Sequence, residues 1–298
     1  MRWSPASPPS RQRGSIAIIA LWGLAIVFVL LAAASFTTRT ELQITRNELA
    51  AIRAREAAEA GTQLGLAHLL ARLARGTVLF DGTPEVWQDG TVRVAIAIAD
   101  EAGKIDLNQA PPGLLAGLFM AVGQPKETAF LLACRVVAKR GGAVPDCPEP
   151  PAGAAEPPSA FAAPEELAAL PGFGDRLYAQ VADFVTVATG ASAVDPAVAP
   201  RTVLLALPGA TPDLVDGWLA ARQSAAEMAP DDSLFEALPN FPFLMVSPVR
   251  DFTVSAVATG PEGARARADL QLRLTRMAGH PYDVLAFRSP PLAAPARR

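Results

Sequence analysis

The sequence contains few of the residues on which catalytic and metal sites are usually built. Among its 298 residues it has only two cysteines and two histidines, His68 and His280. It also lacks a His-Glu-x-x-His pair, a Gly-x-Ser-x-Gly elbow and a glycine-rich phosphate loop. These absences argue against the common zinc protease, serine hydrolase and P-loop chemistries. We interpret His68 as a surface or interface residue, because it falls within an expected long helix.

Charge is scarce as well. Only 18% of the residues are charged and the formal net charge is −3, which gives no support for a general nucleic-acid surface. The hydrophobic share of 51% argues against wholesale disorder. A chain of this length can bury a sizeable core in one or two domains.

No acidic residue occurs between Gly14 and Glu41. Within this interval every residue from Ile16 to Ala34 is apolar except Gly23, and a short basic leader precedes the run. As a helix, these residues would extend roughly 28 Å, close to the thickness of a bilayer core. The run therefore predicts a segment that enters a membrane.

Three interpretations of this segment compete. A cleaved signal peptide would end near Ala32-Ala33-Ala34 and leave a mature protein starting near Ser35. A plain membrane anchor would be retained. The third is a retained helix that continues through residues 40–75, which are rich in Ala, Leu, Glu and Arg. Such a helix over 15–75 would be about 90 Å long, a length typical of membrane spans, coiled coils and filaments.

The short basic leader ending in Gly14, followed by an uninterrupted apolar helix, resembles the precursors of type IV pilins and pseudopilins. The resemblance implies that a prepilin peptidase cuts between Gly14 and Ser15 and methylates Ser15. Most members carry glutamate at the fifth mature position, which is Ile19 here. A buried carboxylate is unfavourable without a partner, so its absence suits a subunit with no neighbour above it.

The rest of the chain predicts a sheet interrupted by helices. A strand at 91–100 and a short strand at 104–108 precede a helical region, and two strands near the C-terminus follow it. Two Leu-Pro-Gly turns, at 170–172 and 207–209, each separate a pair of expected helices. The expected helices cover 112–122, 126–140, 164–170, 175–186 and both halves of 202–222, and the late strands cover 249–259 and 266–275.

In this order the pieces are similar to the K-type minor pseudopilin (GspK) family of type II secretion. The resemblance implies an α+β fold, in which a pilin-like long N-terminal helix packs on an antiparallel sheet and a large α-helical domain is inserted between strands. It also implies a non-enzymatic subunit at the pseudopilus tip, anchored once in the inner membrane with its bulk in the periplasm. The implied partners are I- and J-type minor pseudopilins, the prepilin peptidase, and secreted substrates or the outer-membrane secretin. The expected boundaries are a leader at 1–14, a helix at 15–75 with its membrane span at 15–36, first strands at 76–108, an insert at 109–245 with a Pro/Ala-rich loop at 141–163, last strands at 246–288 and a tail at 289–298.

Two further features stay open at this point. Cys134 and Cys147 are thirteen positions apart and fit either a disulfide in an oxidising periplasm or two free thiols. No cofactor is assigned, although calcium is known among relatives of this family and carboxylates are its preferred ligands. The acids considered, without assignment as ligands, are Asp213, Asp216, Asp231, Asp232 and Glu236.

Alternative functions also fit parts of the pattern. A minor pilin of a type IV pilus would share the N-terminus, but it usually has the fifth-position acid and a smaller head. A membrane-anchored DNA receptor would share helix-hairpin-helix turns, which Leu170-Pro171-Gly172-Phe173-Gly174 resembles. Acids follow both turns, at Asp175 and at Asp213 and Asp216, where phosphate contacts favour Lys or Arg. We therefore predict no nucleic-acid partner and interpret the turns as packing motifs.

Overall fold

The computed structural model describes residues 13–76, 79–142, 147, 157–226, 243–277 and 279–290; the side chains at 13–16, 32–40, 89, 225–226, 262 and 276 are outside this set. Helix α1 (Arg13–Ala74) comes first, and the two parts of an antiparallel sheet flank a helical insert. This arrangement confirms the predicted α+β fold class.

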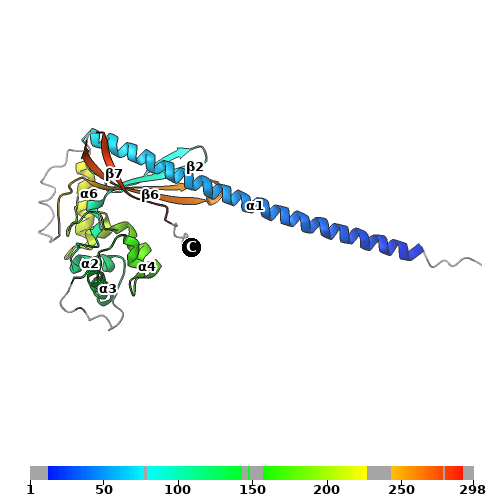
Figure 1. Cartoon of the computed structure of the whole chain (residues 1–298), viewed down its shortest axis with the longest axis horizontal. Helices are drawn as coiled ribbons and strands as arrows, with labels where there is room; N and C mark the ends of the chain where they lie inside the picture. Colours follow the sequence, from blue (N-terminus) through cyan, green and yellow to red (C-terminus); the bar gives the residue numbers. More distant parts are fainter. Residues whose placement is uncertain are drawn as a thin grey trace, which may run out of the picture.

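Helix α1 has two halves with different surroundings. Its first half projects away from the rest of the chain, and its second half lies along the sheet (Figure 1). The apolar side chains from Ile18 to Leu31 are exposed, whereas small residues from Ala50 onward are buried against the sheet. Across the described residues, no helix has an apolar stretch sufficient for a membrane span. Part of the predicted span at 15–36 falls outside the described side chains.

The main sheet has the strand order β1-β2-β5-β6-β7, with every neighbouring pair antiparallel. The strands are β1 (Glu85–Asp89), β2 (Val92–Asp100), β5 (Asp251–Thr259), β6 (Arg265–Met277) and β7 (His280–Arg288), with a short 3-10 helix η4 (Pro261–Gly263) between β5 and β6. Alternate residues face α1, as strand geometry requires. Leu66 and Leu69 of the helix pack there with Ile96, Val254 and Leu270.

The insert occupies the chain between β2 and β5 and has its own hydrophobic core. Its centre includes Leu115, Leu118, Leu132 and Val203, all with 1% or less of their surface exposed. The elements are η1 (Glu101–Gly103), β3 (Ile105–Asp106), α2 (Pro112–Ala121), α3 (Lys126–Lys139), η2 (Pro164–Ala169), α4 (Gly174–Val181), η3 (Ala182–Phe184), β4 (Val185–Thr186), α5 (Arg201–Leu205) and α6 (Pro212–Ala226).

Several local predictions were wrong. The expected strand at 104–108 does not continue the main sheet; β3 instead pairs in parallel with β4. The reason is the 3-10 turn η1, which redirects the chain at the end of β2. The Asp100 carboxylate caps this turn by accepting a 2.9 Å hydrogen bond from the Ala102 amide. The helix expected at 175–186 ends at Val181, and 164–169 is a 3-10 helix. Strands β1 and β7 were not identified individually.

The two Leu-Pro-Gly turns have the same backbone geometry. Gly172 and Gly209 have φ values of 84° and 86°, a region that glycine adopts without steric cost. In each turn the leucine carbonyl accepts a hydrogen bond from the amide three residues later, at 3.1 Å for Leu170 and 3.0 Å for Leu207. The internal similarity seen in the sequence therefore corresponds to a repeated turn.

Candidate functional site

The close packing of α1 on the sheet depends on two glycines. A Cβ atom at Gly61 would lie 2.7 Å from Val94 Cγ1, and one at Gly65 would lie 2.4 Å from Val254 Cγ1. Both distances are far below carbon–carbon contact, so only glycine permits this approach. Strands β2 and β5, which flank the insert in the sequence, are therefore held directly against the helix.

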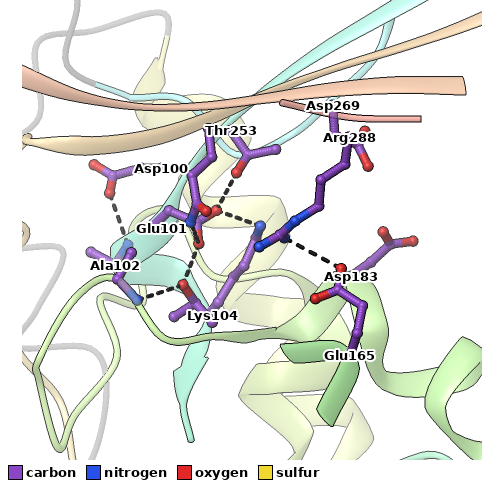
Figure 2. A network of polar contacts seen from close by, with 12 residues as sticks. Asp100, Glu101, Ala102, Lys104, Glu165, Asp183, Thr253, Asp269 and Arg288 are labelled. Atoms are coloured by element: carbon purple, nitrogen blue, oxygen red, sulfur yellow. Dashed lines mark hydrogen bonds and ion pairs between the residues drawn. The ribbon is translucent and has the colours of Figure 1, made fainter. Parts of the chain in front are cut away.

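At the end of these strands, the buried carboxylate of Glu101 joins the insert to the sheet (Figure 2). It accepts hydrogen bonds from the hydroxyl of Thr253 on β5 at 2.7 Å and from the amide of Gln271 on β6 at 3.2 Å. The hydroxyl of Thr186 on β4 and the ammonium of Lys104 also donate to it. One side chain thus connects four segments of the chain.

The electrostatics favour an ionised Glu101. Burial by itself raises the pKa of this carboxyl, but the Lys104 charge and the hydrogen bonds from Lys104, Thr186 and Thr253 outweigh it. The net result is a pKa below the ordinary glutamate value. The junction therefore contains a buried, compensated charge pair, whose members depend on each other.

A second connection runs through Ser247, where the chain returns from the insert. Its backbone amide donates to Asp195 of the insert at 2.6 Å, and its hydroxyl donates to Asp100 of β2 at 2.7 Å. Burial raises the pKa of Asp100 to about 6, and the nearby charges of Asp195 and Glu101 add to the rise. Burial also raises the pKa of Asp195. The carboxylates of Asp100 and Asp195 therefore lie close together at this connection.

Arginines complete the junction around these buried groups. Arg267 of β6 contacts Asp183 of the insert at 2.8 Å, and Arg273 donates to the carbonyl of Ala188 at 2.8 Å. Two more ion pairs bridge the parts, Arg222–Asp81 at 3.1 Å and Arg288–Glu165 at 3.5 Å. Because these contacts come from β6, β7 and the segment before β1, the insert is fixed to the sheet at several points.

The predicted processing residues lie at the far end of the molecule from this junction. Gly14 and Ser15 fall in the first turns of α1, and their surroundings are outside the described residues. Ile19 is described, and 71% of its surface is exposed. The structure places Ile19 on a bare helix and does not test the cleavage or methylation.

The cysteines and the acids considered for calcium have different outcomes. Cys134 of α3 and Cys147 form a disulfide with Cα atoms 5.8 Å apart.

Among the acids considered for calcium, Asp216 accepts two hydrogen bonds from Arg201, of 2.6 and 2.9 Å, and Asp213 lies in the first turn of α6. Asp231, Asp232 and Glu236 lie outside the described residues. Within the described part of the chain, no three His, Cys, Asp or Glu side chains form a metal-binding group.

The first Leu-Pro-Gly turn packs against the insert itself. Arg135 of α3 donates a 2.6 Å hydrogen bond to the carbonyl of Pro171. A Cβ atom at Gly172 would lie 2.2 Å from the same guanidinium. The turn therefore has a structural contact within the insert.

Sequence reasoning did not identify the junction residues. Glu101, Ser247 and Asp195 were given no functional role. Asp106 was also missed, although its carboxylate accepts hydrogen bonds from Gly190 at 2.8 Å and Thr189 at 2.9 Å. The sequence signal at Glu101 is an acid placed directly after a hydrophobic strand, which is too common to assign a partner.

The comparisons with known proteins support the fold. No protein-family profile matches the sequence, and no curated protein matches it. A chain in the crystal structure of the GspK-GspI-GspJ complex from the enterotoxigenic Escherichia coli type 2 secretion system is similar, with a TM-score of 0.54 and 14% sequence identity. The alignment covers 86% of this chain and 99% of that chain. At this identity the similarity shows a shared fold, in agreement with the predicted long helix, antiparallel sheet and helical insert.

Proposed function

We propose that this chain is a minor pseudopilin at the tip of a type II secretion pseudopilus, and that it works by assembly rather than by catalysis. The proposal rests on two features seen together. The first half of α1 is apolar and exposed, and the globular part of the chain is enlarged by an insert that is fixed to the sheet. The similarity to a chain of the GspK-GspI-GspJ complex supports it. By analogy, its partners are I- and J-type minor pseudopilins.

The proposed maturation follows from the N-terminal sequence. A prepilin peptidase cuts between Gly14 and Ser15, methylates Ser15, and leaves the apolar half of α1 intact. Residues 15–36 first hold the subunit in the inner membrane with the basic leader inside, consistent with the distribution of arginines. The same residues then pack with the helices of sibling subunits.

The capping role rests on two features. Ile19 offers no carboxylate for the N-terminal amine of a subunit above, and the insert adds bulk at the end of the sheet remote from the apolar half of α1 (Figure 1). This head is also the part of the molecule that would meet secreted substrates or the secretin in the periplasm.

N-terminal sequencing and mass spectrometry of the mature protein test this proposal. A methylated N-terminus at Ser15 is expected. A start near Ser35 would show that the apolar segment is removed as a signal peptide, and would end the pseudopilin interpretation.

A further inference from the structure

A cleft of about 240 Å³ lies between the last turns of α1 and the edge strand β1. Its lining includes the buried side chains of Phe80 and Ile96 and the indole of Trp87, which is 39% exposed. The basic side chains of His68 and Arg72 line the α1 side. Small-molecule pockets usually measure about 300–1,000 Å³, so this cleft has room for one large side chain rather than for a cofactor.

Ring contacts hold the two basic side chains against apolar groups. The rings of His68 and Trp87 meet edge to face, with centroids 5.0 Å apart and planes at 72°. The guanidinium of Arg72 lies 4.8 Å from the centre of the Phe80 ring. Such contacts restrict the rotamers of these side chains before anything binds. A partner side chain therefore meets a preorganised aromatic surface, which lowers the entropic cost of binding.

The charges around the cleft leave its basic side incompletely paired. Among the described residues that line the cleft, the acids are Asp81 and Glu85. Asp81 is paired with Arg222 of the insert at 3.1 Å. Glu85 is 54% exposed and is shared by two bases, at 3.5 Å from Arg72 and 3.8 Å from His68. Both distances exceed the length of a strong charge-assisted hydrogen bond, about 2.7–2.9 Å, so these bases can accept a second carboxylate.

We propose that this cleft binds an apolar side chain and an adjacent carboxylate in a peptide segment of a secreted protein. The apolar side chain packs on Phe80, Ile96 and Trp87, and the carboxylate accepts hydrogen bonds from Arg72. Selectivity comes from the need for both groups side by side, because a basic neighbour is repelled by Arg72 and a neutral one forms no ion pair with it.

The source of the peptide rests on the proposed function. The cleft lies at the end of α1 remote from its apolar half (Figure 1). In a subunit anchored through residues 15–36, this end points away from the inner membrane, toward the route of exported proteins. His68, interpreted from the sequence as a surface or interface residue, then belongs to this contact.

Peptide titrations followed by saturation-transfer NMR on the purified full-length chain test the chemistry. The probe is a short capped peptide with phenylalanine followed by aspartate, and the matched probes carry asparagine or lysine in place of the aspartate. The aspartate probe is expected to bind about fivefold more tightly than the asparagine probe, and the lysine probe most weakly. Added salt should reduce the difference. Equal binding of the three probes, or no binding, would overturn the proposal.

Variants locate the binding in the cleft. Arg72→Gln is expected to abolish the preference for aspartate over asparagine, a pairwise effect that a general loss of structure does not produce. Arg55→Gln is the matched control, because Arg55 also lies on α1 and pairs with Glu59 at 3.0 Å but is not part of the cleft lining. Trp87→Ala should weaken all three probes about tenfold, whereas Val86→Ala, on the opposite face of β1, should not. An unchanged preference in Arg72→Gln would contradict the proposal.

Photo-crosslinking in secreting cells identifies the source of the peptide. A photoreactive residue at Thr83, which lines the cleft, is expected to form an adduct with a protein that the same cells export to the medium. The same residue at Val86, which is 59% exposed, is the control and is expected to give much less adduct. Adducts confined to a sibling subunit, to the secretin or to lipid would overturn the assignment to a secreted protein.

These results separate the inference from the proposed function. If the chain matures at Ser15 and co-purifies with its siblings but binds no probe, the cleft proposal is wrong and the pseudopilin role stands. If the chain binds the aspartate probe but starts near Ser35, the peptide chemistry is right, and the pseudopilin role and the secreted source are both wrong.

Discussion

The carboxylate of Glu101 accepts a 2.7 Å hydrogen bond from the hydroxyl of Thr253, although 152 positions separate them in the sequence. The first residue follows β2 and the second lies in β5, the strand that pairs with β2. The bond therefore forms at the point where the chain leaves the sheet for the insert, beside the strand on which it returns.

Replacing Glu101 with glutamine is expected to destabilise the protein. The change leaves the Lys104 ammonium, which is only 14% exposed, without its anionic partner, at a cost of about 2–4 kcal/mol. Urea unfolding measures the difference. Asp216→Asn is the control, because the Arg201–Asp216 pair is exposed and little change is expected. An unchanged midpoint for Glu101→Gln would show that the carboxylate does not anchor the insert.

Asp100 makes stability depend on pH between its unfolded and folded pKa values, from about 3.8 to about 6. Its pKa is about 6 in the folded chain against an ordinary value of 3.8, so the fold favours the protonated form. Stability is therefore expected to fall as the pH rises from about 4 to about 6, by up to about 3 kcal/mol for a shift of this size, and to stay level above that. The rise in the pKa of Asp195 acts in the same direction.

The matched variant for this dependence is Asp100→Asn, which keeps the side-chain shape but cannot ionise. Chemical denaturation at several pH values is expected to give a flatter profile for the variant than for the unmodified chain. The lowered pKa of Glu101 has the opposite sign, and its contribution is lost only at lower pH, as that carboxylate protonates. Parallel profiles for the two proteins would contradict the assignment to Asp100.

Adding one methyl group at Gly65 is expected to separate α1 from the sheet. The new Cβ atom would lie 2.4 Å from Val254 Cγ1 and 2.8 Å from Ile96 Cγ2, and overpacking of this kind costs about 1–3 kcal/mol. Gly217→Ala in α6 is the control, because no atom beyond the adjoining backbone of its own helix lies within 4 Å of its added methyl group. There the better helix propensity of alanine should stabilise the chain by about 0.5–1 kcal/mol. Thermal unfolding of both variants compares them directly.

The disulfide between Cys134 and Cys147 is expected to stabilise the insert. Closing a loop of this size in the unfolded chain contributes about 2–3 kcal/mol, so Cys134→Ser with Cys147→Ser should lower stability by that amount. A reductant should lower the stability of the unmodified chain and have no further effect on the double variant. Equal stability with and without reductant would contradict the bond.

Ile19→Glu tests the proposed position at the tip. At the end of a fibre the new carboxylate has no amine above it and remains an unpaired charge in an apolar bundle, which is strongly unfavourable. The amount of this chain co-purifying with sibling subunits, and the secretion that depends on it, should fall, whereas Ile19→Leu should behave like the unmodified chain. Full assembly and secretion with Ile19→Glu would argue for a subunit that has a neighbour above it.

Elements with strong local patterns could be predicted from the sequence. The alternation in 266–275 identified β6, and the helix continuing past Ala34 identified α1. Predictions failed where the partner decides the structure. Ile105 and Asp106 form a strand, but they pair with Val185 and Thr186 rather than with the main sheet. A run this short carries no signal for which of two sheets it joins.

The sequence by itself determined the length of α1, the absence of an acid near its start and the position of the insert between strands. These properties depend on residues close together along the chain, so periodicity and composition reveal them. Only the tertiary structure decided that Glu101 lies in a buried junction with Thr186, Thr253 and Gln271. The environment of a carboxylate is set by groups that fold around it from distant parts of the chain, and no local pattern records which groups those are.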